Sequence, residues 1–170
     1  IATGSKPIEI PSAKFSKNIV DSTGALSFDK VPKTLGVVGA GIIGLELGSV
    51  WSRLGSEVTV IEALDDFLPI ADKDISKESL KEFKKQGLDI QLGSKVTKSS
   101  QEKDCVTVTY ENQGKEIEKK FDKLIVAVGR SPNSEGVIDE GLNISINKGF
   151  IEVNEFCQTA VSNIWAVGDV

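Results

Sequence analysis

The stretch from Leu35 to Glu62, LGVVGAGIIGLELGSVWSRLGSEVTVIE, decides the fold because it contains strand, turn, helix and strand in that order. A short apolar run over residues 34–38 predicts a strand, and a glycine-rich turn follows it directly. Helical spacing then predicts a helix that ends at Gly55. Its apolar positions are Ile43, Leu47, Val50, Trp51 and Leu54. Residues 58–61 form a second β-branched strand. The stretch is therefore a predicted βαβ unit.

The turn carries three glycines, Gly39, Gly41 and Gly44, in the spacing GxGxxG. Such triplets also occur by chance, so the strand before them and the helix after them give the motif its weight. In a dinucleotide fold the first glycine allows the tight turn, the second admits the pyrophosphate and the third lets the helix pack closely. The helix N-terminus attracts the phosphates. Residues 39–44, with Ala40, Ile42 and Ile43 between the glycines, are the predicted pyrophosphate loop.

Glu62 ends the second strand, where an acidic side chain binds the adenosine ribose hydroxyls and repels a 2′-phosphate. The expected cofactor is therefore NAD(H) in preference to NADP(H). The alternative is a structural strand, turn and helix with a surface glutamate.

Composition narrows the function further. Hydrophobic residues make up 39% and charged residues 26% of the 170 residues, and the net charge is −5. These values are ordinary for a globular chain and give no general attraction for nucleic acid. No apolar run is long enough to span a membrane. Histidine is absent, which removes Ser/His and Cys/His nucleophile systems and the commonest metal ligand. We therefore expect no catalytic residue, metal site, nucleic acid or membrane partner in this chain.

The two cysteines, Cys105 and Cys157, are far apart and lack a metal-like spacing. They are expected to be small apolar side chains in or near a core, in a reducing compartment.

The rest of the chain predicts an α/β fold with a Rossmann-like dinucleotide-binding domain and an antiparallel β-meander. Residues 6–33 are expected to have little regular structure. Residues 72–86 predict a helix capped by Asp72 or Asp74, with Ile75, Leu80 and Phe83 inward and its lysines in solvent. The expected strands are residues 88–92, one containing Val106, Val108 and Tyr110, one containing Ile117 and Phe121 after a turn at 112–114, residues 124–128, residues 150–153 and residues 163–167.

Several separated motifs carry a family resemblance. They are the stretch 39–62, KKQGLDI at 84–90, DKLIVAVGRSPN at 122–133 and NIWAVGDV at 163–170. In this order they resemble the disulfide reductase flavoproteins, and within them the NAD-using dihydrolipoamide dehydrogenases. The resemblance covers essentially the whole chain, and it implies an oxidoreductase that uses NAD and FAD.

The resemblance also implies roles for individual residues. Glu46 would lie near the flavin and nicotinamide rings, Val96 would touch adenine, and Gly129 would lie against NAD. For Glu46 the alternative is a surface glutamate, and for Gly129 a simple turn. Thr3, Gly4 and Asp169 would contact FAD in an intact parent protein.

The chain begins at Ile1 and contains no methionine, which suggests a piece of a longer parent. The expected division is a remnant of the FAD domain at 1–5, a lead-in at 6–33, the NAD-binding domain at 34–155 and a return to the FAD domain at 156–170. A CxxxxC redox pair, a second GxGxxG and a histidine base are absent, so the chain alone is expected to be inactive.

The resemblance implies that the parent oxidises protein-bound dihydrolipoyl groups with NAD. It would be a homodimer in a 2-oxo acid dehydrogenase or glycine cleavage complex, in the bacterial cytoplasm or the mitochondrial matrix. The alternatives are the middle domain of another NADH-dependent flavin reductase, and a free-standing NAD-binding module.

Overall fold

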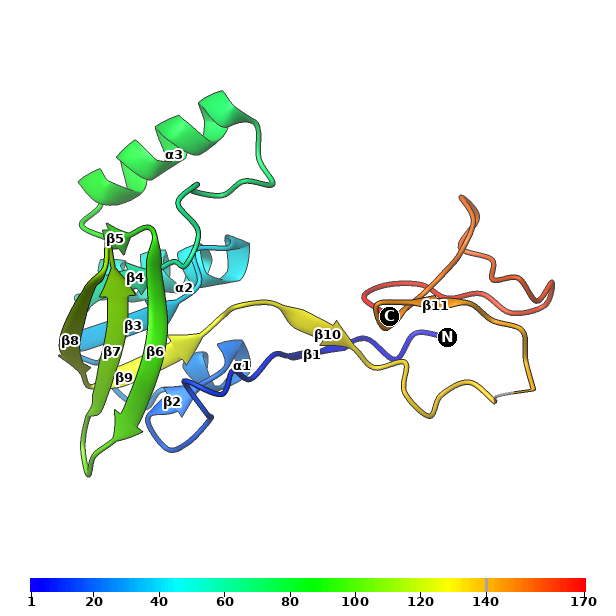
Figure 1. Ribbon diagram of the computed structural model, residues 1–170, viewed down its shortest axis with the longest axis horizontal. Coiled ribbons are helices and arrows are strands. Elements are labelled where there is room, and N and C mark those ends of the chain that lie inside the picture. Colours follow the sequence, from blue (N-terminus) through cyan, green and yellow to red (C-terminus); the bar gives the residue numbers. More distant parts are fainter. Residues whose placement is uncertain (140) are drawn as a thin grey trace. The chain divides into compact units, whose positions relative to one another are not determined.

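The computed structural model describes residues 1–139 and 141–170, and it divides into two compact units. Unit 1 comprises residues 1–8 and 129–170, and unit 2 comprises residues 9–128. Figure 1 shows the course of the chain through both units. The glycine-rich turn and Glu62 both belong to unit 2.

A five-stranded parallel sheet forms the centre of unit 2. Its strands, in spatial order, are β2 (Ile19–Val20), β9 (Lys123–Val126), β3 (Thr34–Val38), β4 (Glu57–Ile61) and β5 (Asp89–Gln91). The central strands β3, β4 and β9 are rich in valine, isoleucine and leucine, which is typical of parallel strands covered on both faces. β3 and β4 are neighbours, so the turn after β3 and Glu62 after β4 lie at the same sheet edge.

Strand alternation divides the core into two clusters. Leu35, Val37, Val58 and Val60 face one cluster, which also contains Leu45, Leu47 and Trp51 from a helix. Val38, Ile61, Leu124 and Val126 face the other cluster, with Val106, Val108, Tyr110 and Phe121 from two antiparallel strands. Unit 2 thus has a helical layer, a parallel sheet and an antiparallel sheet.

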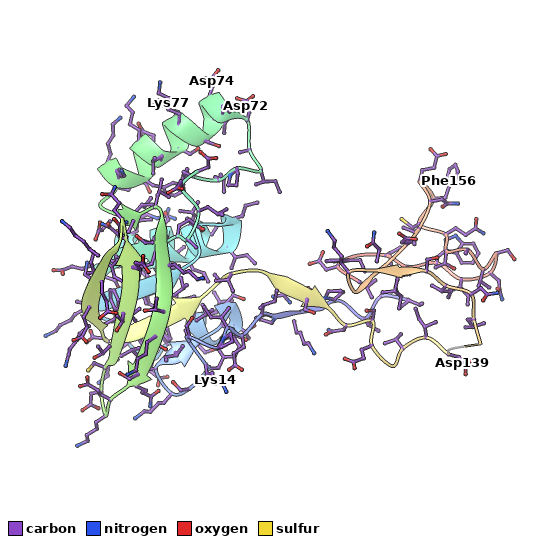
Figure 2. All side chains as sticks on the ribbon, viewed as in Figure 1. Lys14, Asp72, Asp74, Lys77, Asp139 and Phe156 are labelled. Carbon is purple, nitrogen blue, oxygen red and sulfur yellow. The ribbon has the colours of Figure 1, made fainter. Side chains whose placement is uncertain are left out.

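Three helices belong to unit 2: α1 (Ser22–Ala25), α2 (Ile42–Arg53) and α3 (Lys73–Lys85). Gly41 is the N-cap of α2, and Asp72 caps α3 by accepting a hydrogen bond from the Asp74 amide at 2.9 Å. Asp72 and Asp74 mark the start of α3 in Figure 2. The helix expected over residues 72–86 is therefore confirmed, with Asp72 as its cap.

The antiparallel sheet has the order β6 (Ser94–Gln101), β7 (Val106–Asn112) and β8 (Lys115–Phe121). Gln113 and Gly114 form the β7–β8 turn with positive φ angles of 50° and 74°. The register shifts between Val96 and Lys98, which marks a bulge in β6. This sheet confirms the predicted β-meander.

Unit 1 contains two short antiparallel pairs. β1 (Ser5–Pro7) pairs with β10 (Arg130–Pro132), and β11 (Ile146–Asn147) pairs with β12 (Phe150–Ile151). Its buried cluster consists of Ile151, Ala166 and Val170, with Ile1 packed against it. The amide of Val167 donates to the Ile1 carbonyl at 2.9 Å, so the two ends of the chain lie together.

Several sequence predictions require correction. Residues 6–33 contain β2 and α1, which are too short to leave a periodic pattern. β6 was missed because its outer face is polar, and residues 163–167 contribute only a bridge from Trp165 to Gln158. Residues 150–153 shorten to β12. On the helices Val50, Leu54 and Ile75 are exposed, whereas Leu80 and Phe83 are half-buried.

Candidate functional site

Gly39 and Gly44 fix the shape of the turn between β3 and α2. Gly39 has a φ of +102°, and a Cβ there would lie 2.5 Å from the Ala127 carbonyl oxygen. A Cβ on Gly44 would lie 2.1 Å from the carbonyl oxygen of Gly39. Neither position has room for a side chain, so the start of α2 packs directly on the turn.

Gly41 has the opposite environment. Its φ is −74°, which any residue can adopt, and no atom lies within 4 Å of where its Cβ would be. The first i to i−4 bond of α2 runs from the Leu45 amide to the Gly41 carbonyl at 3.0 Å. The amides of Ile42, Ile43 and Gly44 precede that bond and belong to the electropositive end of the helix. The open space beside Gly41 is where an anion would meet these amides.

Glu62 is joined to this turn by its side chain. Its Oε2 accepts from the Ala40 amide at 2.6 Å, and its Oε1 accepts from the Leu64 amide at 2.9 Å. The Gly39 amide also donates to the Ile61 carbonyl at 2.9 Å. The structure thus brings Gly39, Ala40, Gly41 and Glu62 together, as the sequence predicted for one site.

The half-buried Glu62 carboxylate retains acceptor capacity beyond these two bonds. Two carboxylate oxygens offer about four lone-pair directions, so it can also accept from a vicinal diol. A second anion at the same place would be repelled. The residues therefore fit an adenosine ribose that carries no phosphate.

Glu46 lies one turn into α2 and is exposed. With Ile43, Leu47, Val50 and Arg53 of α2 it lines a groove of about 620 Å³, whose other lining residues are Ser22, Thr23, Leu26, Ser49 and Phe83. The groove shows Glu46 to be accessible on unit 2. Its predicted role beside the flavin and nicotinamide rings stays a prediction.

Val96 belongs to unit 2 and Gly129 to unit 1. Val96 is 7% exposed and packs in the cluster with Ile61 and Tyr110, so its side chain faces the core. Gly129 belongs to unit 1, where its carbonyl accepts from the Ile8 amide at 3.1 Å and its φ is +130°. Their predicted contacts with NAD stay predictions.

Thr3, Gly4 and Asp169 are brought together within unit 1. The Thr3 hydroxyl donates to the Asn133 carbonyl at 2.7 Å, and the Asn133 amide donates to the Gly4 carbonyl at 2.8 Å. The Ser5 hydroxyl donates to Asp169 Oδ2 at 3.4 Å. The two ends of the sequence thus form one local cluster, and the predicted contacts of these residues with FAD stay predictions.

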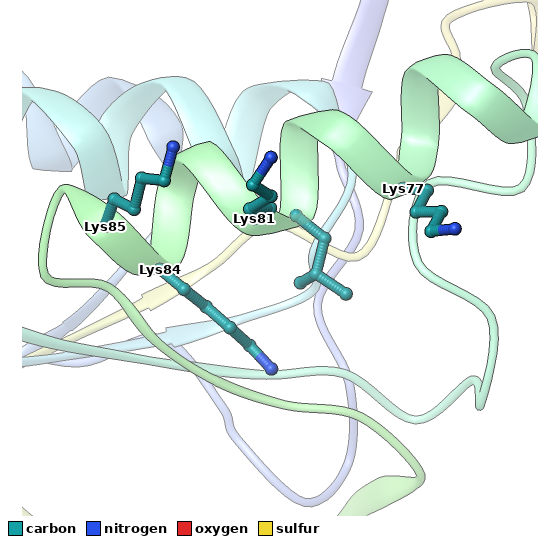
Figure 3. A pocket seen from close by; sticks show the side chains of 5 residues that line it. Lys77, Lys81, Lys84 and Lys85 are labelled. Atoms are coloured by element: carbon teal, nitrogen blue, oxygen red, sulfur yellow. The ribbon is translucent and has the colours of Figure 1, made fainter.

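Lysines on α3 line a separate groove of about 520 Å³, shown in Figure 3. Lys77, Lys81, Lys84 and Lys85 surround Leu80 there. Lys81 pairs with Glu78 at 3.0 Å and Lys85 pairs with Glu82, and all four lysines are exposed. The solvated face predicted for this helix is confirmed.

Sequence reasoning missed the residues that hold Glu62 in place. Ser94 and Asn112 form hydrogen bonds around the backbone of Glu62 and the loop beside it. These residues lie far from Glu62 in the sequence and belong to no motif, so no sequence pattern points to them.

Metal and membrane functions gain no support. Within residues 1–139 and 141–170, no group of three or more His, Cys, Asp or Glu side chains could hold a metal ion. In the same ranges, no helix is long and apolar enough to cross a bilayer. Both cysteines are free thiols, and Cys157 is exposed, contrary to the expectation of a place in or near a core.

Comparison with known proteins gives consistent matches along the whole chain. The family described as "Pyridine nucleotide-disulphide oxidoreductase" matches residues 1–170. Dihydrolipoyl dehydrogenase of Cupriavidus necator is 49% identical over 173 aligned residues, which cover 100% of this chain and 36% of that protein. Dihydrolipoyl dehydrogenase of Geobacillus stearothermophilus is 42% identical, with the same coverage. The chain thus spans about a third of the length of these relatives.

Solved structures with a similar fold belong to related proteins. The HOCl-induced flavoprotein disulfide reductase RclA of Escherichia coli has a TM-score of 0.84 and 33% identity. The match covers 98% of this chain and 38% of that one. LpdA of Mycobacterium tuberculosis has a TM-score of 0.86 and 28% identity, over 99% of this chain and 36% of that one. The α/β fold predicted from the sequence is confirmed.

The family description contains a pyridine nucleotide and the E. coli neighbour is a flavoprotein, so the two predicted cofactor classes are those of these relatives. The resemblance predicted from the separated motifs is likewise confirmed by matches along the whole of this chain. This chain belongs to the pyridine nucleotide-disulphide oxidoreductase family.

Proposed function

We propose that unit 2 is the NAD(H)-binding domain of a flavoprotein dihydrolipoamide dehydrogenase. The observation that carries the proposal is the Glu62 carboxylate, 2.6 Å from the Ala40 amide at the edge of the open space beside Gly41. A pyrophosphate on the α2 amides and a ribose on Glu62 use both features together. Bound NAD and FAD supply the hydride-transfer chemistry, and the chain binds and orients them.

NAD is favoured over NADP by charge. A 2′-phosphate would bring about two negative charges to a carboxylate already held by two amides. Two further carboxylates, Asp65 and Asp66, follow Glu62 closely and are exposed. This part of the chain offers anions where an NADP site needs cations.

The whole parent reaction is part of the same proposal, because the chain spans only 36% of the relatives' length. The parent would oxidise a protein-bound dihydrolipoyl group and reduce NAD, as a homodimer in a 2-oxo acid dehydrogenase or glycine cleavage complex. A bacterial cytoplasm or the mitochondrial matrix would be its location. Thr3, Gly4 and Asp169 would serve its FAD, and Glu46, Val96 and Gly129 would serve NAD near the nicotinamide and adenine ends.

The division at 1–5, 6–33, 34–155 and 156–170 also stays a proposal. The contacts group residues 129–155 with unit 1, so the FAD-side segments we propose are longer than the sequence alone suggested. The chain contains no CxxxxC and no histidine. We therefore expect it not to oxidise dihydrolipoamide when purified alone, and turnover without added protein would contradict this.

A second candidate is the middle domain of another NADH-dependent flavin reductase, which the similarity to RclA favours. It shares the nucleotide site but differs in the disulfide substrate. A redox CxxxxC in the flanking sequence followed by lipoamide turnover of the full-length protein would select the first candidate. The third possibility is a free-standing NAD-binding module.

The direct test is calorimetric titration of the chain with NAD and NADP, beside a Glu62→Ala variant. We expect the chain to bind NAD more tightly than NADP. The variant should bind NAD more weakly and show a smaller difference between its affinities for NAD and NADP. Lys84→Ala on the α3 groove is the matched control and should bind as the parent chain does. Equal affinities for both nucleotides in both proteins would overturn the proposal.

A further inference from the structure

The backbone of Glu62 is held by the end of β5 and the start of β6, the two strand ends on either side of a short loop. The Glu62 amide donates to the Gln91 carbonyl at 2.9 Å, and the Ser94 amide donates to the Glu62 carbonyl at 2.7 Å. In the loop itself, the Gly93 amide donates to the Leu64 carbonyl at 2.9 Å. The end of β5 and the start of β6 therefore fix the backbone of Glu62, and the loop between them holds Leu64.

The same loop is held from its other side by one side chain of the β-meander. Asn112 Nδ2 donates to the Leu92 carbonyl at 2.9 Å and to Ser94 Oγ at 2.6 Å. Ser94 is 1% exposed, and its hydroxyl donates in turn to the Leu92 carbonyl at 3.3 Å. Both amide protons of Asn112 are thus used on residues 92–94, at the end of the loop that contacts Glu62.

The β6–β7 hydrogen-bond ladder of the meander does not by itself hold residues 92 and 93. Ser94 and Asn112 are the terminal pair of the β6–β7 register, so Leu92 and Gly93 lie outside the ladder. Gly93 also has a φ of +60°, and the Asp65 Oδ1 atom lies only 2.5 Å from its Cβ position. The Gly93 and Ser94 amides are bonded to the segment after β4, and Asn112 adds bonds to the Leu92 carbonyl and the Ser94 hydroxyl from the side of the meander.

We infer that Asn112 is a positioning residue for nucleotide selection, acting through Ser94 and the backbone of Glu62. This inference rests on the proposed NAD site and adds to it a link between the antiparallel sheet and the adenosine end. Asn112 does not itself touch the nucleotide. It keeps the Glu62 carboxylate in reach of the Ala40 amide and of the ribose hydroxyls.

The first test measures amide hydrogen exchange by NMR without nucleotide. In Asn112→Ala the amides of Ser94 and Ala40 should exchange about tenfold faster relative to the Leu45 amide, since loss of two hydrogen bonds frees the loop. The Leu45 amide bonds to Gly41 within α2 and corrects for any general loss of stability. An unchanged ratio would show that Asn112 does not hold Glu62.

The second test measures NAD and NADP affinity by calorimetry. Asn112→Ala should weaken NAD by roughly 2- to 10-fold, the range expected for one or two such bonds, and narrow the NAD preference. Val108→Ala is the matched control, because it removes a buried side chain of the same strand that faces the core rather than the loop. It should lower the melting temperature and leave the ratio of the two affinities unchanged.

The third test combines substitutions. If Asn112 acts through Glu62, the double variant Asn112→Ala with Glu62→Gln should have the same NAD to NADP ratio as Glu62→Gln alone. Independent, additive changes would overturn the inference and leave the proposed function standing. A chain that binds neither nucleotide would overturn the proposed function together with this role, even if the exchange result shows that Asn112 holds the loop.

Discussion

The Glu62 carboxylate and the Ala40 amide are joined by a hydrogen bond of 2.6 Å, so the predicted ribose acid also holds the predicted pyrophosphate loop. Two functions of one side chain can be separated by substitution. The charge of Glu62 sets which nucleotide is accepted, and its length sets whether the carboxylate reaches Ala40.

Glu62→Asp and Glu62→Gln should therefore change nucleotide binding in different ways. The aspartate keeps the charge but is one methylene shorter, so it should lose NAD affinity by up to roughly tenfold while still excluding NADP. The glutamine keeps the length and one acceptor oxygen, so it should bind NADP better relative to NAD. Titration of both variants with both nucleotides separates the effects. Identical profiles for the two variants would contradict a dual role.

Gly44→Ala should prevent the loop from forming. Its Cβ would lie 2.1 Å from the Gly39 carbonyl oxygen, which is rigid backbone, so α2 would have to shift from the sheet. Overpacking of this kind costs about 1–3 kcal/mol and sometimes more. We expect a lower melting temperature, measured by circular dichroism, together with loss of NAD binding.

Gly41→Ala is its matched counterpart. No atom lies within 4 Å of that Cβ position, and the backbone φ of −74° suits alanine. Folding stability should fall by less than about 1 kcal/mol, the cost of a poorer N-cap. NAD binding should nevertheless be strongly weakened, because the methyl group occupies the space proposed for the pyrophosphate. Unchanged NAD affinity would place the phosphates elsewhere.

The sequence predicted this loop well because its constraints are local. Gly39, Gly44 and the flanking strand and helix all lie within a few residues of one another. The turn admits no side chain at Gly39 or Gly44, so glycine at these two positions marks it in the sequence. The support for Glu62 is non-local. Ser94 reaches the Glu62 carbonyl through its backbone amide, and Asn112 reaches Ser94 through its side chain. β6, which carries Ser94, alternates too weakly to be recognised as a strand.

The burial of the helices also depends on contacts that are distant in the sequence. Val50 and Leu54 fit the apolar spacing of α2 but are 43% and 55% exposed, because the sheet beneath covers only part of the helix. Periodicity gives the direction of a helical face, whereas the width of its cover depends on what packs against it.

The two thiols should differ in reactivity. Burial, with added effect from the nearby Glu102 carboxylate, raises the pKa of Cys105, so less thiolate is present at pH 8 than for an ordinary thiol. Cys157 is exposed. Mass spectrometry after brief treatment with iodoacetamide should find Cys157 alkylated first. The rate of Cys105 alkylation should increase as the pH rises through 9.

Glu102→Gln tests the cause of this difference. It removes the negative charge beside Cys105 Sγ, which lies 3.4 Å from Glu102 Oε2, and so should lower the pKa of Cys105 and speed its alkylation. The rate for Cys157 serves as the internal control and should not change. Equal acceleration of both thiols would indicate general loosening of the chain instead.

Residues 9–128 should fold and bind NAD without unit 1. The five-stranded sheet, the meander and both large buried clusters lie within that range, and so do Glu62, Ala40 and the start of α2. Among the residues of unit 1 that the structure describes, the buried apolar cluster consists of Ile151, Ala166 and Val170, which is a small core for independent stability. The shortened chain should therefore give a cooperative thermal transition, dispersed amide NMR signals and an NAD affinity within about twofold of the longer chain. A shortened chain that unfolds, while Val170→Ala in the longer chain also abolishes NAD binding, would show instead that the nucleotide site depends on unit 1.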